Sequence, residues 1–425
     1  QMMDSWLYDE EKPFIHIEAL DTFKFLKKQI GTGYYEELIQ KYLLDNPHGA
    51  IVIVTPEKGR TARMEAELEE KLQKYKESLT AEEVEAFVQK TQALEAYQSE
   101  PESEENLEKI PVLKREDISR EIEPIINEEM TLAGVPVIFH EIETNGIGYV
   151  DVLFDMSLVE EQDLPYVGIL QSVLGIIDTK RYDYGTLFNE INVNTGGIST
   201  SLELYNDVTN IREKAFKATF EIKGKALYGK LPVAFDMMRE ILMENDGKRI
   251  REILAMLKSR LLMKFQSSGH VTAVLRAQSY ASPAAKLKDM TNGIAFYETV
   301  SYIEEHFEEE KEKLSEKLID LSKKLFCGDN MMLSYTAARE GLEGLEEMVE
   351  KLKNSLHTRT AEEDKRCVIH CEKKNEGFKT ASKVQYVAKA GNFIDLGVAY
   401  TGALQILKVI MSYDYLWQNI RVKGG

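Results

Sequence analysis

The stretch that decides the fold reads Val135-Pro-Val-Ile-Phe-His-Glu-Ile142, then Thr144-Asn145-Gly146, then Tyr149-Val-Asp-Val-Leu-Phe-Asp-Met156. Apolar and polar residues alternate in the last run, which places four apolar side chains on one face: Val150, Val152, Phe154 and Met156. An Asn-Gly pair between two such runs is typical of a tight turn. The stretch predicts a β-hairpin with one buried face.

Further strands and helices follow this hairpin. Ile198 to Tyr205 and Phe216 to Ile222 also alternate, and helical spacing then runs from about Lys225 to Met243, from Arg249 to Gln266 and through much of Pro283 to Leu325. Strands grouped together and helices grouped together indicate an α+β fold with an antiparallel sheet, not a βαβ sheet. We therefore predict an α+β domain over residues 125–360.

The segment upstream of this domain resembles the end of another one. Tyr34 to Leu44 has helical spacing, an Asn46-Pro47-His48-Gly49 turn follows, and Ala50 to Thr55 is apolar enough for a buried strand. A weak internal repeat relates Leu38–Gly59 to Leu318–Gly341. Because a lone helix and strand cannot bury both their faces, we interpret residues 1–57 as the tail of a domain that begins upstream.

Residues 58–124 are rich in Glu, Lys, Ala and Leu and have helical spacing. Thr80 and Glu83 have the spacing of a capping box, which predicts a second helix after a break near Leu79. The segment is therefore expected to be an antiparallel helical hairpin with charged, solvated faces.

The final segment, residues 361–425, starts another unit. A strand is expected over Arg366 to Glu372 and a helix from about Tyr400 to Met411. These elements are too few to close a core, so we interpret the segment as the beginning of a truncated domain.

The composition excludes several classes of protein. The chain has 425 residues, 43% of them apolar and 29% charged, with a net charge of −19. Such a charge repels nucleic acid and anionic lipid surfaces. No apolar run is long enough to span a membrane, and Gln1 to Glu11 does not have the pattern of a secretory signal. Three cysteines in so long a chain favour a reducing compartment over a disulfide framework.

Candidate catalytic motifs are weak. Cys367, His370 and Cys371 carry metal-binding atoms, but alternation in a strand would point His370 away from the cysteines, so buried structural cysteines are the preferred interpretation. Tyr302 to His306 resembles half of an inverted zinc motif with Tyr302 in a ligand position, and an acidic helix accounts for it better. Serine-nucleophile elbows and phosphate-binding glycine loops are absent from the sequence.

The order of several motifs is more specific than any one of them. The landmarks are Asn46-Pro47-His48, the acidic hairpin from Lys58 to Glu123, Asn145-Gly146-Ile147-Gly148-Tyr149, Leu164-Pro165-Tyr166, Thr195-Gly196-Gly197-Ile198-Ser199 and Tyr415-Leu416-Trp417 with Ile420-Arg421-Val422-Lys423-Gly424-Gly425. Over essentially all 425 residues the chain resembles the pitrilysin/insulinase family of inverted zinc metallopeptidases, in its presequence-protease and falcilysin branch. The resemblance implies repeated metallopeptidase-like α+β domains in two halves, joined by the long helical hairpin.

The resemblance also implies where the zinc site lies. The family's active first domain carries His-x-x-Glu-His, and in this chain Tyr166, Ile169 and Leu170 stand in the matching places. The chain is thus expected to hold no catalytic residue and no metal ligand. In this resemblance the parent protein would bind zinc upstream of Gln1. Residues 125–360 would be the third, zinc-free domain, and residues 1–57 would be the end of the second domain.

A substrate-binding role is implied for Arg421, which matches a family arginine that hydrogen-bonds the substrate backbone. The family's partner tyrosine would fall two residues past Gly425. The expected parent is a zinc metalloendopeptidase that degrades unstructured peptides in an enclosed chamber, with this chain as wall and substrate-binding surface, inactive without its zinc-bearing N-terminal half.

Two other interpretations stay open, a non-catalytic structural or peptide-binding homologue and, less favoured, a helical adaptor. A bacterial cytoplasm is the expected location, with an organelle lumen as the alternative.

Overall fold

The computed structural model describes residues 2–207, 210, 216–245, 247–359, 368–380 and 384–422. The chain divides into two compact units, Gln1–Ser119 and Arg120–Gly425. The predicted strand Arg366 to Glu372 lies partly outside the described residues, and its described part, residues 368–372, forms no strand. Across the described residues, no helix is long and apolar enough to cross a membrane.

The first unit is helical and buries almost nothing. Its helices are α1 (Met2–Trp6), α2 (Ala19–Lys28), α3 (Tyr34–Ile39) with the π-helix η1 (Gln40–Leu44), α4 (Arg60–Ser78), α5 (Ala81–Ser99) and α6 (Glu104–Glu108). Of residues 2–119 only Ser5 is buried. The predicted helix from Tyr34 to Leu44 is confirmed.

The predicted strand at Ala50 to Thr55 is wrong for this chain. Residues 51–54 are extended but pair with no strand among the described residues, and their side chains are 82% to 93% exposed. A strand needs a neighbour for its backbone hydrogen bonds, and the described part of the chain supplies none beside this run.

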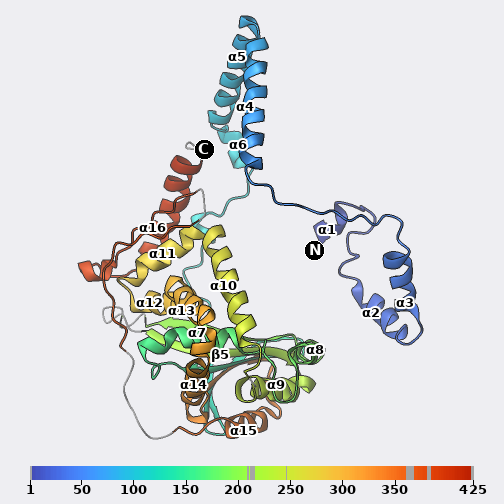
Figure 1. The fold of residues 1–425 in the computed structure, drawn as a ribbon, viewed down its shortest axis with the longest axis vertical. Coiled ribbons are helices and arrows are strands. Elements are labelled where there is room, and N and C mark those ends of the chain that lie inside the picture. The colour runs from blue at the N-terminus through green and yellow to red at the C-terminus, as the bar shows by residue number, and fades with distance from the viewer. Residues whose placement is uncertain are drawn as a thin grey trace. The chain divides into compact units, whose positions relative to one another are not determined.

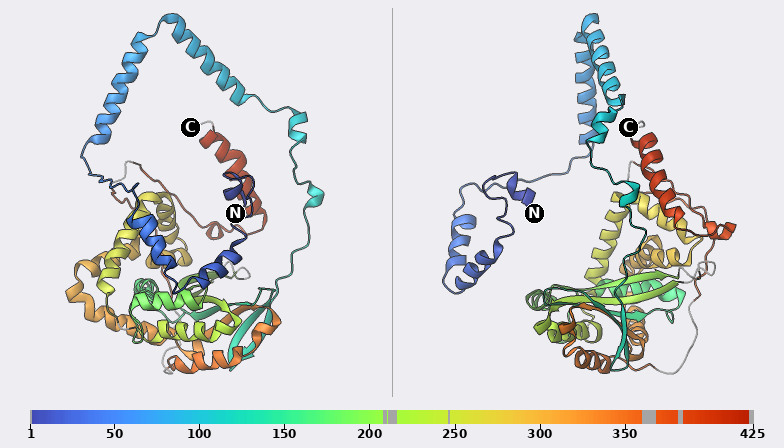
Figure 2. Two further views of the ribbon diagram at one scale, coloured as in Figure 1. Left: turned by 90° about the vertical axis from the view of Figure 1, so that its right-hand side faces the viewer. Right: turned by 180° about the vertical axis from the view of Figure 1, so that it is seen from behind.

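The two long helices predicted for residues 58–124 are confirmed. Thr80 Oγ1 accepts a hydrogen bond from the Glu83 amide at 3.2 Å, and Glu83 Oε2 accepts one from the Thr80 amide at 2.8 Å, which completes the predicted capping box. The left view of Figure 2 shows α4 and α5 diverging from the turn between them. The expected packed antiparallel hairpin is therefore not formed, and the apolar stripe of α4 is exposed at Met64, Leu68, Leu72 and Tyr75.

The second unit is built on one six-stranded sheet (Figure 1). Its strands are β1 (Glu128–Leu132), β2 (Val135–Glu141), β3 (Ile147–Asp155), β4 (Ile198–Asn206), β5 (Phe216–Leu227) and β6 (Met331–Ala337), in the order β1-β2-β6-β3-β5-β4. The α+β class is confirmed. The purely antiparallel sheet is wrong at one pair, because β2 and β6 run parallel while the other pairs are antiparallel.

The predicted hairpin between β2 and β3 is also wrong. Both strands form, but β6 lies between them, with Val137 opposite Leu333 on one side and Val152 opposite Leu333 on the other. β2 forms its hairpin with β1 through a turn at Ala133 and Gly134, where both residues have positive φ. Local alternation identified the strands but could not identify a partner that lies far along the sequence.

Helices cover one face of the sheet and extend beyond it. They are α7 (Leu164–Val173), α8 (Tyr184–Asn194), α9 (Leu231–Met243), α10 (Ile250–Ser267), α11 (Gly269–Ser279), α12 (Pro283–Asn292), α13 (Ile294–Glu305), α14 (Phe307–Leu325) and α15 (Leu345–Ser355). The helix α16 (Ala403–Ile410) and the π-helix η9 (Met411–Val422) follow later in the chain and bury no residue. Under the helices that cover the sheet, Phe326 packs edge-to-face on Phe154 of β3 and Phe220 of β5, with ring centroids 5.2 and 5.1 Å apart. This aromatic cluster is fully buried and fixes the sheet beneath the helices.

Candidate functional site

The opposite face of the sheet carries polar side chains, which we call the polar face. Its central residues are Asp151 of β3, Ser201, Glu203 and Tyr205 of β4, and Thr219, Glu221 and Lys223 of β5. Alternate residues of a strand share a face. The register then places Asp151 directly opposite Lys223, and Ser201 opposite Glu221.

At the centre of the polar face, one ammonium lies among three carboxylates. Lys223 Nζ lies 2.8 Å from Glu221 Oε2 and 3.5 Å from both Asp151 Oδ2 and Glu203 Oε1. Glu221, whose side chain is fully buried, also accepts hydrogen bonds from Tyr205 Oη at 2.7 Å and from Thr219 Oγ1 at 2.6 Å. The cluster keeps two negative charges in excess when all its carboxylates are ionised.

These surroundings change the proton affinity of three groups. Burial, with the nearby Glu221 carboxylate second, raises the pKa of Asp151 to about 6 although Lys223 opposes the shift. Burial and the hydrogen bond to Glu221 raise the pKa of Tyr205. Burial alone would lower the pKa of Lys223, but the hydrogen bond to Glu221 and the charge of Asp151 outweigh it and raise that pKa. Lys223 thus stays charged at neutral pH, and Asp151 titrates at about pH 6.

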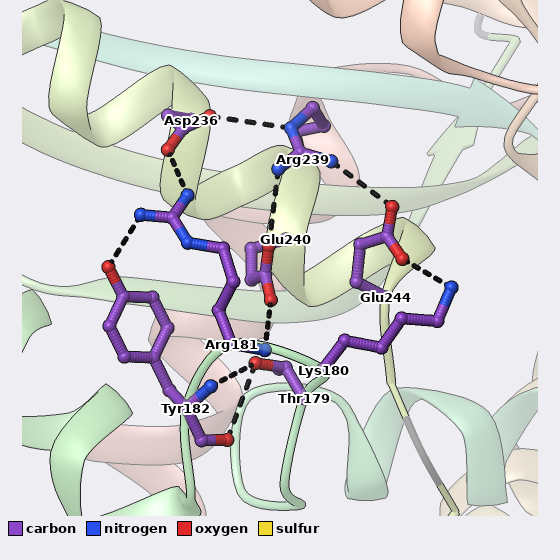
Figure 3. A network of polar contacts seen from close by, with 8 residues as sticks. All are labelled: Thr179, Lys180, Arg181, Tyr182, Asp236, Arg239, Glu240 and Glu244. Atoms are coloured by element: carbon purple, nitrogen blue, oxygen red, sulfur yellow. Dashed lines mark hydrogen bonds and ion pairs between the residues drawn. The ribbon is translucent and has the colours of Figure 1, made fainter.

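A second polar network, shown in Figure 3, is balanced in charge. It joins the loop at Thr179, Lys180, Arg181 and Tyr182 to Asp236, Arg239 and Glu240 of α9 and to Glu244, which directly follows this helix. The buried Glu240 accepts from the Arg181 amide at 3.1 Å and from Arg239 at 3.2 Å, while Lys180 pairs with Glu244 at 2.6 Å. Three carboxylates here face three cations, so the network fixes the loop on α9 and offers no excess charge to a ligand.

Arg421 lies in η9 and is solvent-exposed. The structure places it in the same unit as the sheet, but it joins no described ion pair with the polar face. Lys423, Gly424 and Gly425 lie outside the described residues. The substrate-binding role of Arg421 therefore stays a prediction.

The residues in the family's zinc-binding places do not fit a metal. Ile169 and Leu170 of α7 are buried in the core, and Tyr166 packs against it. A Cβ at Gly168 would lie 2.7 Å from the Phe296 ring and from the Thr291 carbonyl oxygen, so α7 is packed closely against α12 and α13. This helix is a core element with no room or ligands for zinc.

The other metal candidates are also dispersed. Cys371 is exposed, so the expectation of buried structural cysteines is wrong there, and Cys367 lies outside the described residues; Cys327, which was not part of that expectation, is buried. His370 contacts Glu161, and Tyr302 stacks on His306 at 4.6 Å between ring centroids. Among the described residues no group of three or more His, Cys, Asp or Glu is arranged to hold a metal ion.

The polar face was not identified as a site from the sequence, although its residues alternate visibly in β4 and β5. The signal was an unbroken polar series, Thr219, Glu221 and Lys223, opposite a second polar series in β4. The second unit is thus an α+β domain whose sheet has one apolar face and one polar face with an acidic centre.

A family model described as associated with subfamily C of the M16 peptidases matches residues 54–303, more than half of the chain. The chain therefore belongs to this peptidase-associated family, and the resemblance to presequence proteases is confirmed. It is 35% identical to Protein HypA of Clostridium perfringens over 428 residues, an alignment that covers 100% of this chain and 43% of that protein.

An alignment of similar coverage is found with a eukaryotic relative. Presequence protease 1, chloroplastic/mitochondrial, of Arabidopsis thaliana is 26% identical over 437 residues, covering 100% of this chain and 40% of that protein. The chain thus spans about two fifths of the length of these relatives. A crystal structure described as a peptidase M16 inactive domain from Pseudomonas fluorescens superposes with a TM-score of 0.38 at 13% identity, over 56% of this chain and 52% of that one.

Proposed function

We propose that this chain is the C-terminal-half portion of a zinc metalloendopeptidase that degrades unstructured peptides inside an enclosed chamber. The observation that carries the proposal is the alignment of the entire chain with a presequence protease. In this proposal the polar face lines the chamber, and zinc chemistry belongs to an N-terminal half that this chain must meet to act. A reducing compartment, such as the cytoplasm of a bacterium, is the proposed location.

The charge of the polar face supports a preference for basic peptides. In the cluster around Lys223 three carboxylates outnumber one ammonium, and the whole chain carries a net charge of −19. Coulomb attraction concentrates cationic substrates near such a surface and weakens as salt is added. Acidic peptides of the same length should be poorer substrates, and the difference should shrink at high ionic strength.

Arg421 supplies the proposed contact to the substrate backbone. A guanidinium offers several donors in a rigid plane and can hold a carbonyl oxygen in position. Because this contact would be made in the ground state as well as in the transition state, its loss should raise KM and leave kcat unchanged. The exposed position of Arg421 in η9 leaves its donors available to such a ligand.

The experiment compares this chain with the product of a longer reading frame that includes the zinc-bearing half. Both are tested on a quenched fluorescent basic peptide, with and without a zinc chelator. We expect no cleavage by this chain and chelator-sensitive cleavage by the longer protein. In the longer protein, R421Q should raise KM about tenfold, and K408Q, which removes an exposed cation of α16, should not.

Each result has a distinct meaning. Chelator-sensitive cleavage by this chain alone would overturn the assignment of catalysis to the other half. A longer protein that binds no zinc and cleaves nothing would favour the non-catalytic structural or peptide-binding homologue. Equal KM values for R421Q and the parent would leave peptidase activity intact but remove Arg421 from the site.

A further inference from the structure

Residues 368–380, which we call the strap, follow the sheet domain and form neither helix nor strand. Because no helix or sheet ladder fixes this backbone, side chains must hold it in place. The contacts occur at helices α11 and α12 and at Glu161, all within the second unit. The strap leads toward α16 and η9, which carries Arg421.

A receptor for the strap is already assembled on the two helices. Arg276 of α11 donates to Asp289 Oδ2 of α12 at 2.6 Å, and the Asp289 side chain is only 2% exposed. The other oxygen, Asp289 Oδ1, accepts from the Ile294 amide at 2.9 Å. A carboxylate fixed in this way orients the guanidinium without any help from the strap.

Glu376 of the strap meets the free edge of this guanidinium. Arg276 Nε donates to Glu376 Oε2 at 2.8 Å and Arg276 Nη2 donates to Glu376 Oε1 at 3.1 Å, a two-point contact. The Tyr280 hydroxyl also donates to Glu376 Oε2. The Phe378 ring lies 5.7 Å from the guanidinium carbon, which adds a cation–π contact from the same segment.

We infer that Arg276, oriented by the buried Asp289, clamps Glu376 and so holds the strap on α11 and α12, positioning the chain that carries Arg421. The clamp needs both a fork of donors and a carboxylate, and Glu376 supplies the carboxylate. The hydrogen bond from Arg276 also holds the pKa of Glu376 below its ordinary value, so this carboxylate is ionised at neutral pH.

Two further contacts agree with this inference. Lys286 of α12 bridges Glu161 and the His370 carbonyl oxygen, each at 2.5 Å, and Glu161 accepts from the His370 amide at 2.9 Å. Past the strap, the Tyr386 ring packs on Gly269, where an added Cβ would lie 2.5 Å from the ring. The chain thus contacts α11 and α12 both before and after Glu376.

Trypsin provides the test on this chain, because Lys379 lies in the strap just after the clamp. The initial rate of cleavage after Lys379 is measured by mass spectrometry and divided by the rate for a free peptide of residues 368–386 with the same sequence. Cleavage of a docked segment reports the fraction of time that it is open. E376Q removes the carboxylate charge, and R276K keeps a cation beside Asp289 but removes the fork.

We expect both variants to raise the normalised rate about tenfold, which is the factor expected when a partly exposed charge-assisted contact is lost. The matched control is E372Q, because Glu372 pairs with Lys374 of the strap itself at 3.3 Å and is 78% exposed. Its normalised rate should equal that of the parent chain. Far-UV circular dichroism confirms that each variant retains its fold.

An unchanged rate in E376Q, or an equal increase in E372Q, would overturn the clamp. The positioning of Arg421 rests on the proposed function and has its own readout in the longer protein. There, E376Q should raise KM with kcat unchanged, and should add nothing to R421Q. Additive effects would overturn the positioning role, and an inactive longer protein would refute the proposed function while the trypsin result stands.

Discussion

Asparagine in place of Asp151 is expected to stabilise the sheet domain. Asp151 lies on the polar face with 26% of its side chain exposed, and its surroundings raise its pKa from 3.8 to about 6. In the unfolded chain the carboxyl has its ordinary affinity for protons. Ionising it therefore costs more in the folded state, and above pH 6 the folded protein carries that cost.

The magnitude follows from the size of this shift. A difference of about two pKa units corresponds to about 3 kcal/mol at pH values above both pKa values. Partial exposure and structural relaxation reduce this figure, so D151N should raise the free energy of unfolding by about 1 to 3 kcal/mol at about pH 7. Asparagine cannot ionise, so its advantage should shrink to about 0.5 kcal/mol or less at about pH 4, where Asp151 is protonated when folded.

The sign of the pH dependence is as important as the magnitude. Between about pH 4 and pH 6 the folded state binds a proton at Asp151 that the unfolded state releases. This group alone therefore makes the parent chain less stable as the pH rises through that window. D151N should remove this component, whereas K223M should enlarge it, because Lys223 opposes the raised pKa of Asp151.

Urea denaturation followed by far-UV circular dichroism is the suitable assay. Trp6 and Trp417 are both 53% exposed and lie outside the sheet, so tryptophan fluorescence would report poorly on its unfolding. A loss of stability in D151N at neutral pH would refute the reasoning, because it would mean that the attraction to Lys223 outweighs the cost of burial. A gain of equal size at neutral and at acidic pH would also refute it.

Four other substitutions test the packing. E240A removes the buried carboxylate that accepts from Arg239 and the loop, and should cost about 2 to 3 kcal/mol in urea denaturation. L333A at the centre of the sheet should cost about 3 kcal/mol, whereas V52A, at a side chain 82% exposed, should leave the free energy of unfolding unchanged in this chain. G168A should lower the midpoint of thermal unfolding, because its Cβ would clash with the backbone of α12 at a cost of about 1 to 3 kcal/mol.

The sequence predicted elements well and their partners poorly. Alternation located β3, β4 and β5, and the capping box at Thr80 located the start of α5. The partner of β3 could not be found in this way, because β6 comes from the far end of the domain and inserts between β2 and β3. Strand pairing over such a separation depends on tertiary packing, which a local sequence pattern does not show.

The candidate site shows the same limit. The sequence displays Glu221 and Lys223 as ordinary polar residues of an alternating strand, and only the register shows that Asp151 lies opposite Lys223. The raised pKa of Asp151 depends on this three-strand arrangement and could not be read from any one strand. Arg421, by contrast, came from the resemblance alone, and the structure adds only that it is exposed in η9.

A comparison of β6 with residues 51–54 shows what a strand needs beyond apolar residues. In β6, Leu333 is fully buried because β2 and β3 flank it, while Val52 and its neighbours are extended and exposed without a described partner. Burial of an apolar side chain stabilises by about 1.5 to 3 kcal/mol. The side chains of residues 51–54 are exposed and therefore do not make this contribution. A strand therefore depends on flanking partners as much as on its own apolar residues.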